Sequence, residues 1–295
     1  MERIDYRVKD AKGKEAFVKW ALLICALFGV LALFSIAIFL FATGTPFIFK
    51  TGFSSFFFSS DWKPINGRYG ILSLFTSTML VTLFSTLLGG AIGLFAAIAL
   101  FRFVPKSFKK PCSFAISVLS GIPSVIYGLF GIDFIVPFIR DYVATDGSGY
   151  GIAAATAVLS IMILPTMVSF TLDALNAVDR SYYEGALSLG ASREMALMKV
   201  VVPAARSGIF AALVLSSGRA MGETMAVIMV IGNRPNLTID PFQSTLTLTG
   251  AIALGATEYS DDAKTSLIAV GAVLFALTFI VNLVFAIIKG RDKKC

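Results

Sequence analysis

The feature that most constrains this chain is a set of long apolar segments, because about 20 residues without charge can cross about 30 Å of hydrocarbon as one helix. Six such segments divide the 295 residues, and five of them contain no Asp, Glu, Lys or Arg. The fifth in order carries one Arg and one Glu in its interior. The segments are 20–42, 71–101, 112–132, 152–172, 207–232 and 265–288. The sequence therefore predicts an all-α integral membrane protein with six transmembrane helices.

The residue types that are absent exclude several kinds of chemistry. The chain contains no His, which removes His-type zinc sites, His general bases and Ser-His or Cys-His nucleophile pairs. Its three Cys have no CxxC spacing, so we expect neither a disulfide framework nor a metal centre. We therefore expect a chain that is not an enzyme and that has no cofactor or metal of its own.

The distribution of Lys and Arg predicts how the spans are oriented, because cytoplasmic loops are enriched in these residues. Eighteen of the 25 fall in the tail 1–19, the loops 102–111 and 179–206, and the tail 289–295. Six fall in the intervening loops, and Arg219 lies within a span. Both termini are therefore predicted to be cytoplasmic. The formal net charge of +7 is then an effect of orientation, and we expect no nucleic-acid partner.

Two loops on the predicted outer side carry recognisable patterns. The loop 43–70 is rich in Phe and Trp, which suits an aromatic segment at the level of the lipid headgroups. The loop 233–264 contains an apolar piece, 245–256, that is predicted to be a short re-entrant or interfacial helix. The first span follows nineteen charged and polar residues and is longer than a signal-peptide core, so we expect a retained anchor.

A stripe of small and hydroxylated residues follows one face of the second span. Its members recur at three- and four-residue spacing, which places them on one side of a helix. Such a face either packs closely against another helix or lines a pathway. Pro123 and Pro165 each remove a backbone donor and are expected to bend the third and fourth spans. The stripe consists of Thr78, Thr82, Ser85, Gly89 and Gly93.

The charged residues inside the fifth span are the strongest candidates for a functional site. Counted along an ideal helix, Arg219 falls near the middle of the membrane, where an ionised group costs about 2.5–3.5 kcal/mol to insert. Arg219 and Glu223 are four residues apart, which predicts that both lie on one helical face, turned toward protein or water. They form either an internal ion pair or a polar station on the path of an anion.

The predicted cytoplasmic loop 179–206 has the pattern of two short helices. Ser181 followed by Glu184 fits a capping box, and Gly190 fits a helix C-terminus. Ser192 then begins a second helix through 193–200, which Pro203 is expected to end. The same loop contains a spaced motif: Glu184-Gly185-Ala186, three residues, Gly190, nine residues, Val200, one residue, Val202-Pro203.

This motif resembles the EAA loop of bacterial ABC importer permeases at every spacing. Gly185 replaces the second Ala of the family pattern, and Val200 and Val202 replace Ile and Leu. The resemblance implies a type I, MetI-like permease core over 71–288 in a bacterial or archaeal cytoplasmic (inner) membrane. It also implies that the loop docks on a separate ATPase. The chain has no Gly-x-x-x-x-Gly-Lys-Ser/Thr loop, so ATP and Mg are expected to be bound by that partner.

Two further stretches resemble the permeases of phosphate-specific ABC transporters, and among them the PstC-like members. They are 120–128 in the third span and Gly218-Arg219-Ala220-Met221-Gly222-Glu223-Thr224 in the fifth. The resemblance implies import of inorganic phosphate with Arg219 and Glu223 on the translocation path. The implied partners are a PstA-like permease or a second copy of this chain, two PstB-like ATPases, and a PstS-like binding protein that is periplasmic or a lipoprotein.

Two other functions are compatible with the same residues. Within the ABC importers, a permease for sulfate, molybdate or phosphonate is one alternative. An ion-coupled secondary transporter or channel would use Arg219 and Glu223 as a charge relay and would need no ATPase. A membrane enzyme is disfavoured, because no acid, base and nucleophile set can be assembled from the intramembrane charges.

Overall fold

The computed structural model describes residues 8–144, 147–258 and 261–291, which are mostly helical. In chain order the longer helices are α1 (Val8–Thr51), α3 (Leu72–Ile98), α4 (Lys106–Gly121), α7 (Ile152–Asn176), α11 (Arg206–Gly222), α13 (Leu248–Glu258) and α14 (Asp261–Arg291). The shorter helices are α2 (Phe53–Phe58), α5 (Ser124–Phe130), α6 (Val136–Tyr142), α8 (Arg180–Ser188), α9 (Arg193–Ala196), α10 (Val202–Ala204) and α12 (Met225–Ile231). Strands β1 (Trp62–Lys63) and β2 (Arg68–Tyr69) form an antiparallel hairpin around the 3-10 turn Pro64–Asn66. Three π-helical turns, Ala99–Phe103, Gly131–Ile135 and Leu197–Val201, interrupt the helices.

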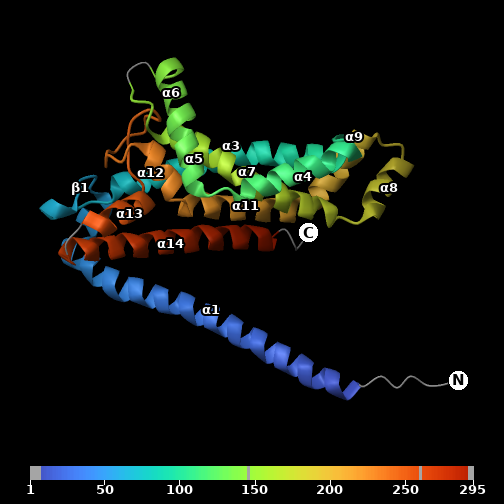
Figure 1. Ribbon diagram of the computed structural model, residues 1–295, viewed down its shortest axis with the longest axis horizontal. Coiled ribbons are helices and arrows are strands. Elements are labelled where there is room, and N and C mark those ends of the chain that lie inside the picture. The colour runs from blue at the N-terminus through green and yellow to red at the C-terminus, as the bar shows by residue number, and fades with distance from the viewer. Residues whose placement is uncertain (1–7, 145–146, 259–260, 292–295) are drawn as a thin grey trace.

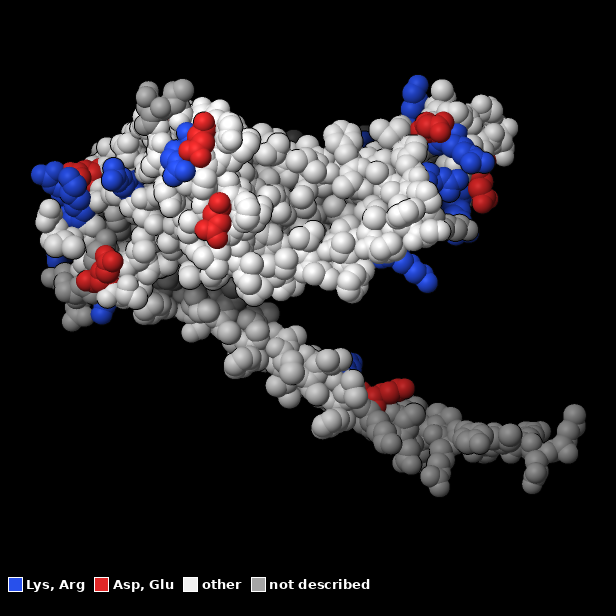
Figure 2. All heavy atoms as spheres, turned by 45° about the horizontal axis from the view of Figure 1, so that its top comes forward, with Lys and Arg blue, Asp and Glu red and all other residues white. Residues whose placement is uncertain are grey.

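The molecule is elongated, and its two ends are built from different elements. Figure 1 shows α8 and α9 at one end, and α6, α12, α13 and β1 at the other. On the face shown in Figure 2, charged side chains gather mainly toward these two ends and leave an uncharged middle. This is the distribution expected of a chain that crosses a membrane along its long axis.

Four helical segments of the described residues are long and apolar enough to cross a membrane singly: Glu15–Thr51, Leu72–Phe103, Ile152–Asn176 and Ala263–Ile287. Two further candidates are bent pairs, Ser107–Gly121 with Ser124–Tyr142 at 97° and Arg193–Ala204 with Arg206–Gly222 at 66°. The described residues therefore contain six spans if each bent pair is one span, which matches the predicted number. Two of the predicted spans are nevertheless not single helices.

The predicted span 112–132 is broken at Ile122 and Pro123. Pro123 has no backbone N–H and stands just before α5. Its ring disfavours a helical conformation at the preceding residue, Ile122, whose backbone is extended. The Tyr127 hydroxyl donates a hydrogen bond to the Leu119 carbonyl at 2.7 Å, across the break. The same carbonyl also accepts from the Ile122 N–H at 3.4 Å, so the end of α4 is closed by two donors. Pro165, by contrast, lies inside α7 without ending it.

Helices α3 and α7 form the central packed pair, and Gly89 and Gly93 of the buried small-residue stripe lie against α7, whereas Thr78 accepts a hydrogen bond from the Leu248 N–H of α13 at 2.9 Å. A Cβ atom on Gly89 would lie 2.6 Å from the Ser160 carbonyl oxygen of α7, so only glycine permits this approach. The Ser160 hydroxyl donates to the Thr156 carbonyl at 2.7 Å within its own helix. Of the two alternatives for the stripe, close helix packing is the one the geometry supports at Gly89.

The predicted aromatic loop 43–70 is more structured than a headgroup-level segment. Helix α1 extends through it to Thr51, and α2 and the hairpin follow. Phe56 and Trp62 are 0% and 3% exposed and pack in a core with residues of α3 and α14, whereas Phe53 and Phe58 are exposed. The interfacial interpretation is therefore wrong for Phe56 and Trp62. The short helix expected in 245–256 is present as α13.

Candidate functional site

The predicted coupling loop forms a helical hairpin at the α8 and α9 end of the molecule (Figure 1). Asp179 is the N-cap of α8, because its carboxylate accepts a hydrogen bond from the Ser181 backbone N–H at 2.8 Å. The predicted capping box of Ser181 and Glu184 is therefore replaced by a cap two residues earlier. Asp and Ser are both good N-caps, so local sequence alone does not rank them.

The turn between the two short helices has the predicted form. Gly190 follows the C-cap of α8 with a φ of 85°, and its N–H donates to the Leu187 carbonyl at 2.9 Å. The next N–H, of Ala191, donates to the Ala186 carbonyl at 3.1 Å, which completes a Schellman motif. Ser192 caps α9 by accepting from the Met195 N–H at 3.2 Å, as expected.

Pro203 does not end the second helix as predicted. The chain continues from α9 through the π-helical turn Leu197–Val201 into α10, where Pro203 occupies the first turn. Pro203 lies just after the π-helical turn and stands one residue before the helix ends at Ala204. The chain bends instead at Ala205, before α11.

The tip of the hairpin is open to solvent. Helix α8 contains no buried residue, and Glu184 and Gly185 are exposed while Ala186 is partly covered. Leu189, at the turn, is 91% exposed. The hairpin tip is therefore an open surface, with Leu189 as its most exposed apolar side chain.

The base of the hairpin is anchored to the membrane helices. Val201 is buried with Leu197 and Ala205 against Ile98 of α3 and Leu175 of α7, and Val202 packs at the edge of this cluster. The motif positions Val200 and Pro203 are only partly covered and exposed, respectively. A rigid base therefore carries an exposed tip.

A polar contact ties α8 to the end of α3. The Arg102 guanidinium donates to the Tyr183 hydroxyl at 2.7 Å and lies 4.5 Å from the centre of its ring. A cavity of about 650 Å³, also lined by Asp179, Arg180 and Glu184, separates α8 from this end of the bundle. No local sequence pattern predicts the contact between Arg102 and Tyr183, because the two residues are 81 positions apart in the chain.

Carboxylates in the hairpin are held in their ionised form. The backbone N–H of Ser181 donates to Asp179 and lowers the pKa of that carboxyl below its usual value. The pKa of Glu194 is lowered as well, first by hydrogen bonding from its own backbone N–H and then by Ser192. Both carboxylates stand at helix N-termini, where negative charge is favoured.

The second candidate region lies where the predicted span 207–232 breaks. Helix α11 ends at Gly222, Glu223 has an extended backbone with φ −72° and ψ 131°, and α12 begins at Met225. Arg219 is thus in the last turn of α11, and Glu223 follows the helix. The prediction that both lie on one face of one continuous helix is wrong.

Arg219 is exposed and faces a polar edge of α7. Its guanidinium donates to the Thr166 hydroxyl at 3.4 Å, and it acts electrostatically on the Tyr127 hydroxyl of α5. Among the ion pairs of the described residues, none joins Arg219 to Glu223. The internal ion pair considered from the sequence is therefore not formed. An exposed guanidinium within a spanning segment needs water, a solute or another protein beside it.

Glu223 is held by the break itself. Its carboxylate accepts from the Ala226 N–H at 3.2 Å and caps α12, and its own N–H donates to the Ala220 carbonyl at 3.3 Å. Its carbonyl accepts from the Thr249 hydroxyl of α13 at 3.1 Å. Nothing local in the sequence predicts the hydrogen bonds of Thr166 with Arg219 and of Thr249 with Glu223, because both threonines come from other helices.

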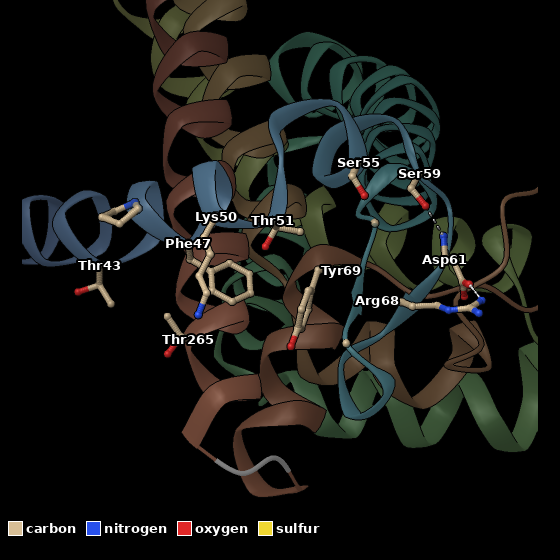
Figure 3. Close-up of a pocket in the computed structure, with 13 residues that line it drawn as sticks. Thr43, Phe47, Lys50, Thr51, Ser55, Ser59, Asp61, Arg68, Tyr69 and Thr265 are labelled. Atoms are coloured by element: carbon tan, nitrogen blue, oxygen red, sulfur yellow. Dashed lines mark hydrogen bonds and ion pairs between the residues drawn. The ribbon is translucent and has the colours of Figure 1, made fainter.

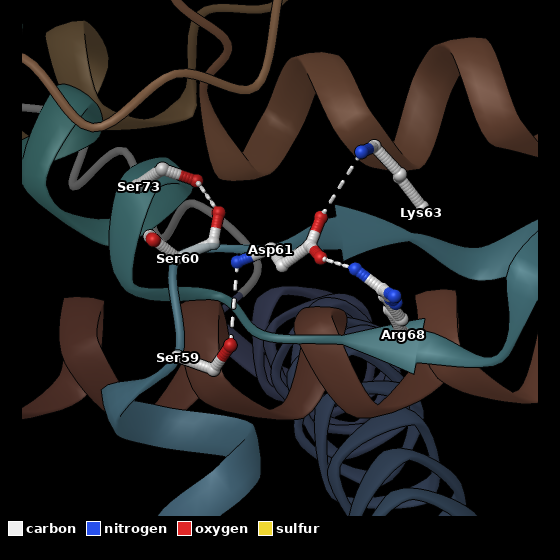
Figure 4. Close-up of polar contacts among 6 residues, drawn as sticks. All are labelled: Ser59, Ser60, Asp61, Lys63, Arg68 and Ser73. Carbon is white, nitrogen blue, oxygen red and sulfur yellow. Dashed lines mark hydrogen bonds and ion pairs between the residues drawn. The ribbon is translucent and has the colours of Figure 1, made fainter.

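A polar cavity of about 750 Å³ lies at the opposite end of the molecule from the α8 and α9 hairpin (Figure 3). It is enclosed by the end of α1, by α2 and by the β1 and β2 hairpin. Lys50 and Tyr69 line it, and the Phe47 ring packs edge-on against Tyr69 with centroids 4.9 Å apart. Asp61 pairs with Arg68 and lies 3.5 Å from the Lys63 ammonium (Figure 4). The hydrogen bond from Arg68 holds the pKa of Asp61 below its usual value. These ion pairs are exposed and stabilise the β1 and β2 hairpin.

Comparison with known proteins identifies the class to which this architecture belongs. Residues 89–293 match the family described as binding-protein-dependent transport system inner membrane component. A chain of the bacterial alginate ABC transporter, solved in complex with a periplasmic protein bound to an alginate pentasaccharide, aligns with a TM-score of 0.69 at 16% identity. That alignment covers 98% of this chain and 99% of the other. The inward-facing MetNI methionine ABC transporter aligns with a TM-score of 0.60 at 19% identity, over 73% of this chain and 92% of the other.

Sequence relatives agree with the fold. The probable ABC transporter permease protein YqgH of Bacillus subtilis is 38% identical, over 91% of this chain and 89% of that protein. The phosphate transport system permease protein PstC of Mesorhizobium japonicum is 33% identical, over 88% and 84%. PstC of Xylella fastidiosa (strain Temecula1) is 32% identical, over 93% and 90%.

The chain belongs to the binding-protein-dependent ABC transporter permeases and is a multi-pass membrane subunit of that family, not an enzyme. The predicted resemblance to PstC-type phosphate permeases is confirmed over most of the chain.

Proposed function

We propose that this chain is the transmembrane permease subunit of an ATP-driven importer of inorganic phosphate in a bacterial cytoplasmic membrane. Relatives named as phosphate permeases share about one third of their residues with it over nearly its whole length, which supports this substrate. The observation that carries the proposal is Arg219, an exposed guanidinium in a spanning helix, with no carboxylate paired to it among the described residues.

Arg219 is suited to bind an oxyanion in passage. Its planar fork donates two parallel hydrogen bonds to phosphate oxygens, and such charge-assisted bonds are strong where water is scarce. The Thr166 and Tyr127 hydroxyls near it add neutral polar groups along the same edge. Glu223 supplies an ionised carboxylate at the next helix break, which accepts a hydrogen bond from the P–OH of hydrogenphosphate and repels sulfate.

The α8 and α9 hairpin is the proposed contact with a separate ATPase. The exposed face of α8, with Glu184, Gly185 and Leu189, would dock on that subunit, and the buried base at Val201 would transmit its movement to α3 and α7. ATP and Mg would be bound by the ATPase, of which two copies are expected. Movement of the hairpin would switch the spans between outward-open and inward-open states.

The exposed Arg219 edge also supports pairing with a second permease, either PstA-like or another copy of this chain. If no second permease covered this edge, the Arg219 guanidinium would face lipid, which is energetically unfavourable. A PstS-like binding protein would dock at the opposite end from the hairpin, and it would provide most of the substrate selection.

The test is substrate-dependent ATPase activity of the complex reconstituted in liposomes, measured with phosphate, sulfate, molybdate and a phosphonate. Stimulation by phosphate, together with ATP-dependent uptake, is expected. Stimulation by another oxyanion instead would change the substrate but keep the transporter class. Uptake by this chain alone, without any ATPase, would support an ion-coupled carrier with Arg219 and Glu223 as its relay and would overturn the proposal.

A further inference from the structure

A smaller cavity lies at the far end of α12 from the Arg219 break. It has a volume of about 340 Å³ and is lined by Ser148, Tyr150, Asn233, Arg234 and Ser244, with Met229 of α12 in its wall. Figure 1 shows this end of the molecule, where α12 meets α6 and the segment leading to α13. Helix α12 has seven residues, about 10 Å of rise, so the cavity stands one short helix away from Glu223.

Arg234 places an uncompensated positive charge at this cavity. Its side chain is exposed, and no hydrogen bond or ion pair joins it to another described residue. Two other arginines at this end are neutralised locally, since Arg68 pairs with Asp61 and Arg140 pairs with Asp141. The Arg234 guanidinium therefore has its donors available for a ligand.

Asn233 adds an acceptor that lacks a donor. Its Nδ2 donates to the Ile228 carbonyl at 2.8 Å, which fixes the orientation of the amide. Its Oδ1 is buried and has no hydrogen-bond partner in the described structure. Asn233 also has a φ of 55°, a left-handed conformation that Asn tolerates better than most residues. A buried carbonyl oxygen without a donor is unfavourable and is satisfied when a ligand brings an O–H group.

The cavity thus combines two requirements that one ligand meets. Arg234 and the hydroxyl-bearing residues Ser148, Tyr150 and Ser244 line the cavity and supply hydrogen-bond donors, while the buried Asn233 Oδ1 is an acceptor without a partner. Hydrogenphosphate offers both kinds of group on one tetrahedral centre. Sulfate has no proton to donate, and the phosphodiester of a lipid headgroup has no P–OH either.

We propose that this cavity is a receiving site for hydrogenphosphate at the outer mouth of the pathway, with Arg234 as the charge partner and Asn233 as the acceptor that recognises the P–OH. The proposal rests on the proposed function, because it assumes that the oxyanion travels along α12 toward Arg219. It assigns to the permease its own selective site, ahead of the intramembrane one.

The test is equilibrium dialysis of radiolabelled inorganic phosphate against the purified permease and ATPase complex without its binding protein. An Arg219→Gln background removes the charge of the intramembrane station, so that the bound phosphate reports the outer cavity. Arg234→Gln in that background is expected to weaken binding by at least about tenfold, the usual effect of losing a hydrogen bond to a charged group. Arg68→Gln is the matched control, because this exposed arginine at the same end is paired with Asp61 and does not line the cavity, so its loss should leave binding unchanged.

A second variant tests recognition of the P–OH separately. Asn233→Gly keeps the left-handed backbone and removes the amide. Excess sulfate should then displace phosphate far more readily than it does from the complex with Asn233. Unchanged binding in Arg234→Gln, or an equal loss in Arg68→Gln, would overturn the site.

The failure of the site and of the proposed function are distinguishable in the same preparation. If the wild-type complex imports phosphate while Arg234→Gln binds and imports as well as wild type, only the receiving site is wrong. If the wild-type complex imports no oxyanion, the proposed function fails and the site falls with it.

Discussion

Arg102, at the end of α3, holds Tyr183 of α8 by two interactions at once, a hydrogen bond to its hydroxyl at 2.7 Å and a guanidinium 4.5 Å above its ring. Tyr183 immediately precedes Glu184, the first residue of the predicted coupling motif. The exposed helix is thereby attached to the same helix that packs along α7 through the centre of the membrane.

This attachment predicts a defect in coupling and not in assembly. Tyr183→Phe keeps the ring beneath Arg102 and removes the hydrogen bond, so the number of phosphates imported per ATP should fall by up to about fivefold, the effect of about 1 kcal/mol. Tyr183→Leu removes both interactions and should lower the ratio further. The measurement is uptake and ATP hydrolysis in the same proteoliposomes, with Tyr182→Phe as the control because Tyr182 is 57% exposed. Equal ratios in all variants would count against the attachment.

The Arg219 break gives a second prediction. Arg219→Gln should lower phosphate uptake by at least about tenfold, because a guanidinium that donates to the oxyanion is lost. Glu223→Gln keeps an amide oxygen to accept from the Ala226 N–H, so α12 should remain capped while the negative charge disappears. Sulfate should then compete more effectively with phosphate for uptake. Normal uptake and selectivity in both assembled variants would remove these residues from the pathway.

The turn at Gly190 predicts an uncoupled transporter when it is altered. Gly190→Pro imposes a φ near −65° where the chain has 85°, and it deletes the N–H that donates to the Leu187 carbonyl. Membrane insertion should be normal, but ATP hydrolysis should no longer drive uptake. Gly190→Asn is the matched control, because Asn tolerates the left-handed conformation and keeps the N–H. Normal uptake driven by ATP in Gly190→Pro would show that the hairpin geometry is dispensable.

Helix packing gives a prediction about stability. Gly89→Ala would place its Cβ 2.6 Å from the Ser160 carbonyl oxygen and should destabilise the bundle by about 1–3 kcal/mol, as overpacking does elsewhere. Gly29→Ala is the control, because a Cβ there meets nothing within 4 Å. Thermal unfolding of the detergent-solubilised complex should show a lower midpoint for Gly89→Ala alone. Equal midpoints would mean that α3 and α7 separate at this point without penalty.

Patterns that act within one segment were predictable from the sequence. Hydropathy located α1, α3, α7 and α14, because each crosses as one helix. The caps at Gly190 and Ser192 followed from residue preferences at helix ends. The resemblance to ABC permeases followed from spacing within one loop.

Features that depend on distant partners were not predictable. The helix breaks at Pro123 and Glu223 lie inside apolar runs. Hydropathy does not detect such a break, because the backbone carbonyls at it accept hydrogen bonds from residues elsewhere in the chain. Trp62 reads as an interfacial aromatic residue until α3 and α14 are seen to cover it. The contact of Arg102 with Tyr183 likewise requires the fold.

The Thr249 hydroxyl of α13 donates a hydrogen bond to the Glu223 carbonyl, so the fifth span depends on a helix outside it. Hydrocarbon offers no hydrogen-bond donors, so a peptide carbonyl released by a helix break must find one within the protein. Helix α13 meets that need for α11 and α12. Replacing residues 248–258 with a flexible linker would therefore destabilise the break in the fifth span, although none of the replaced residues belongs to that span.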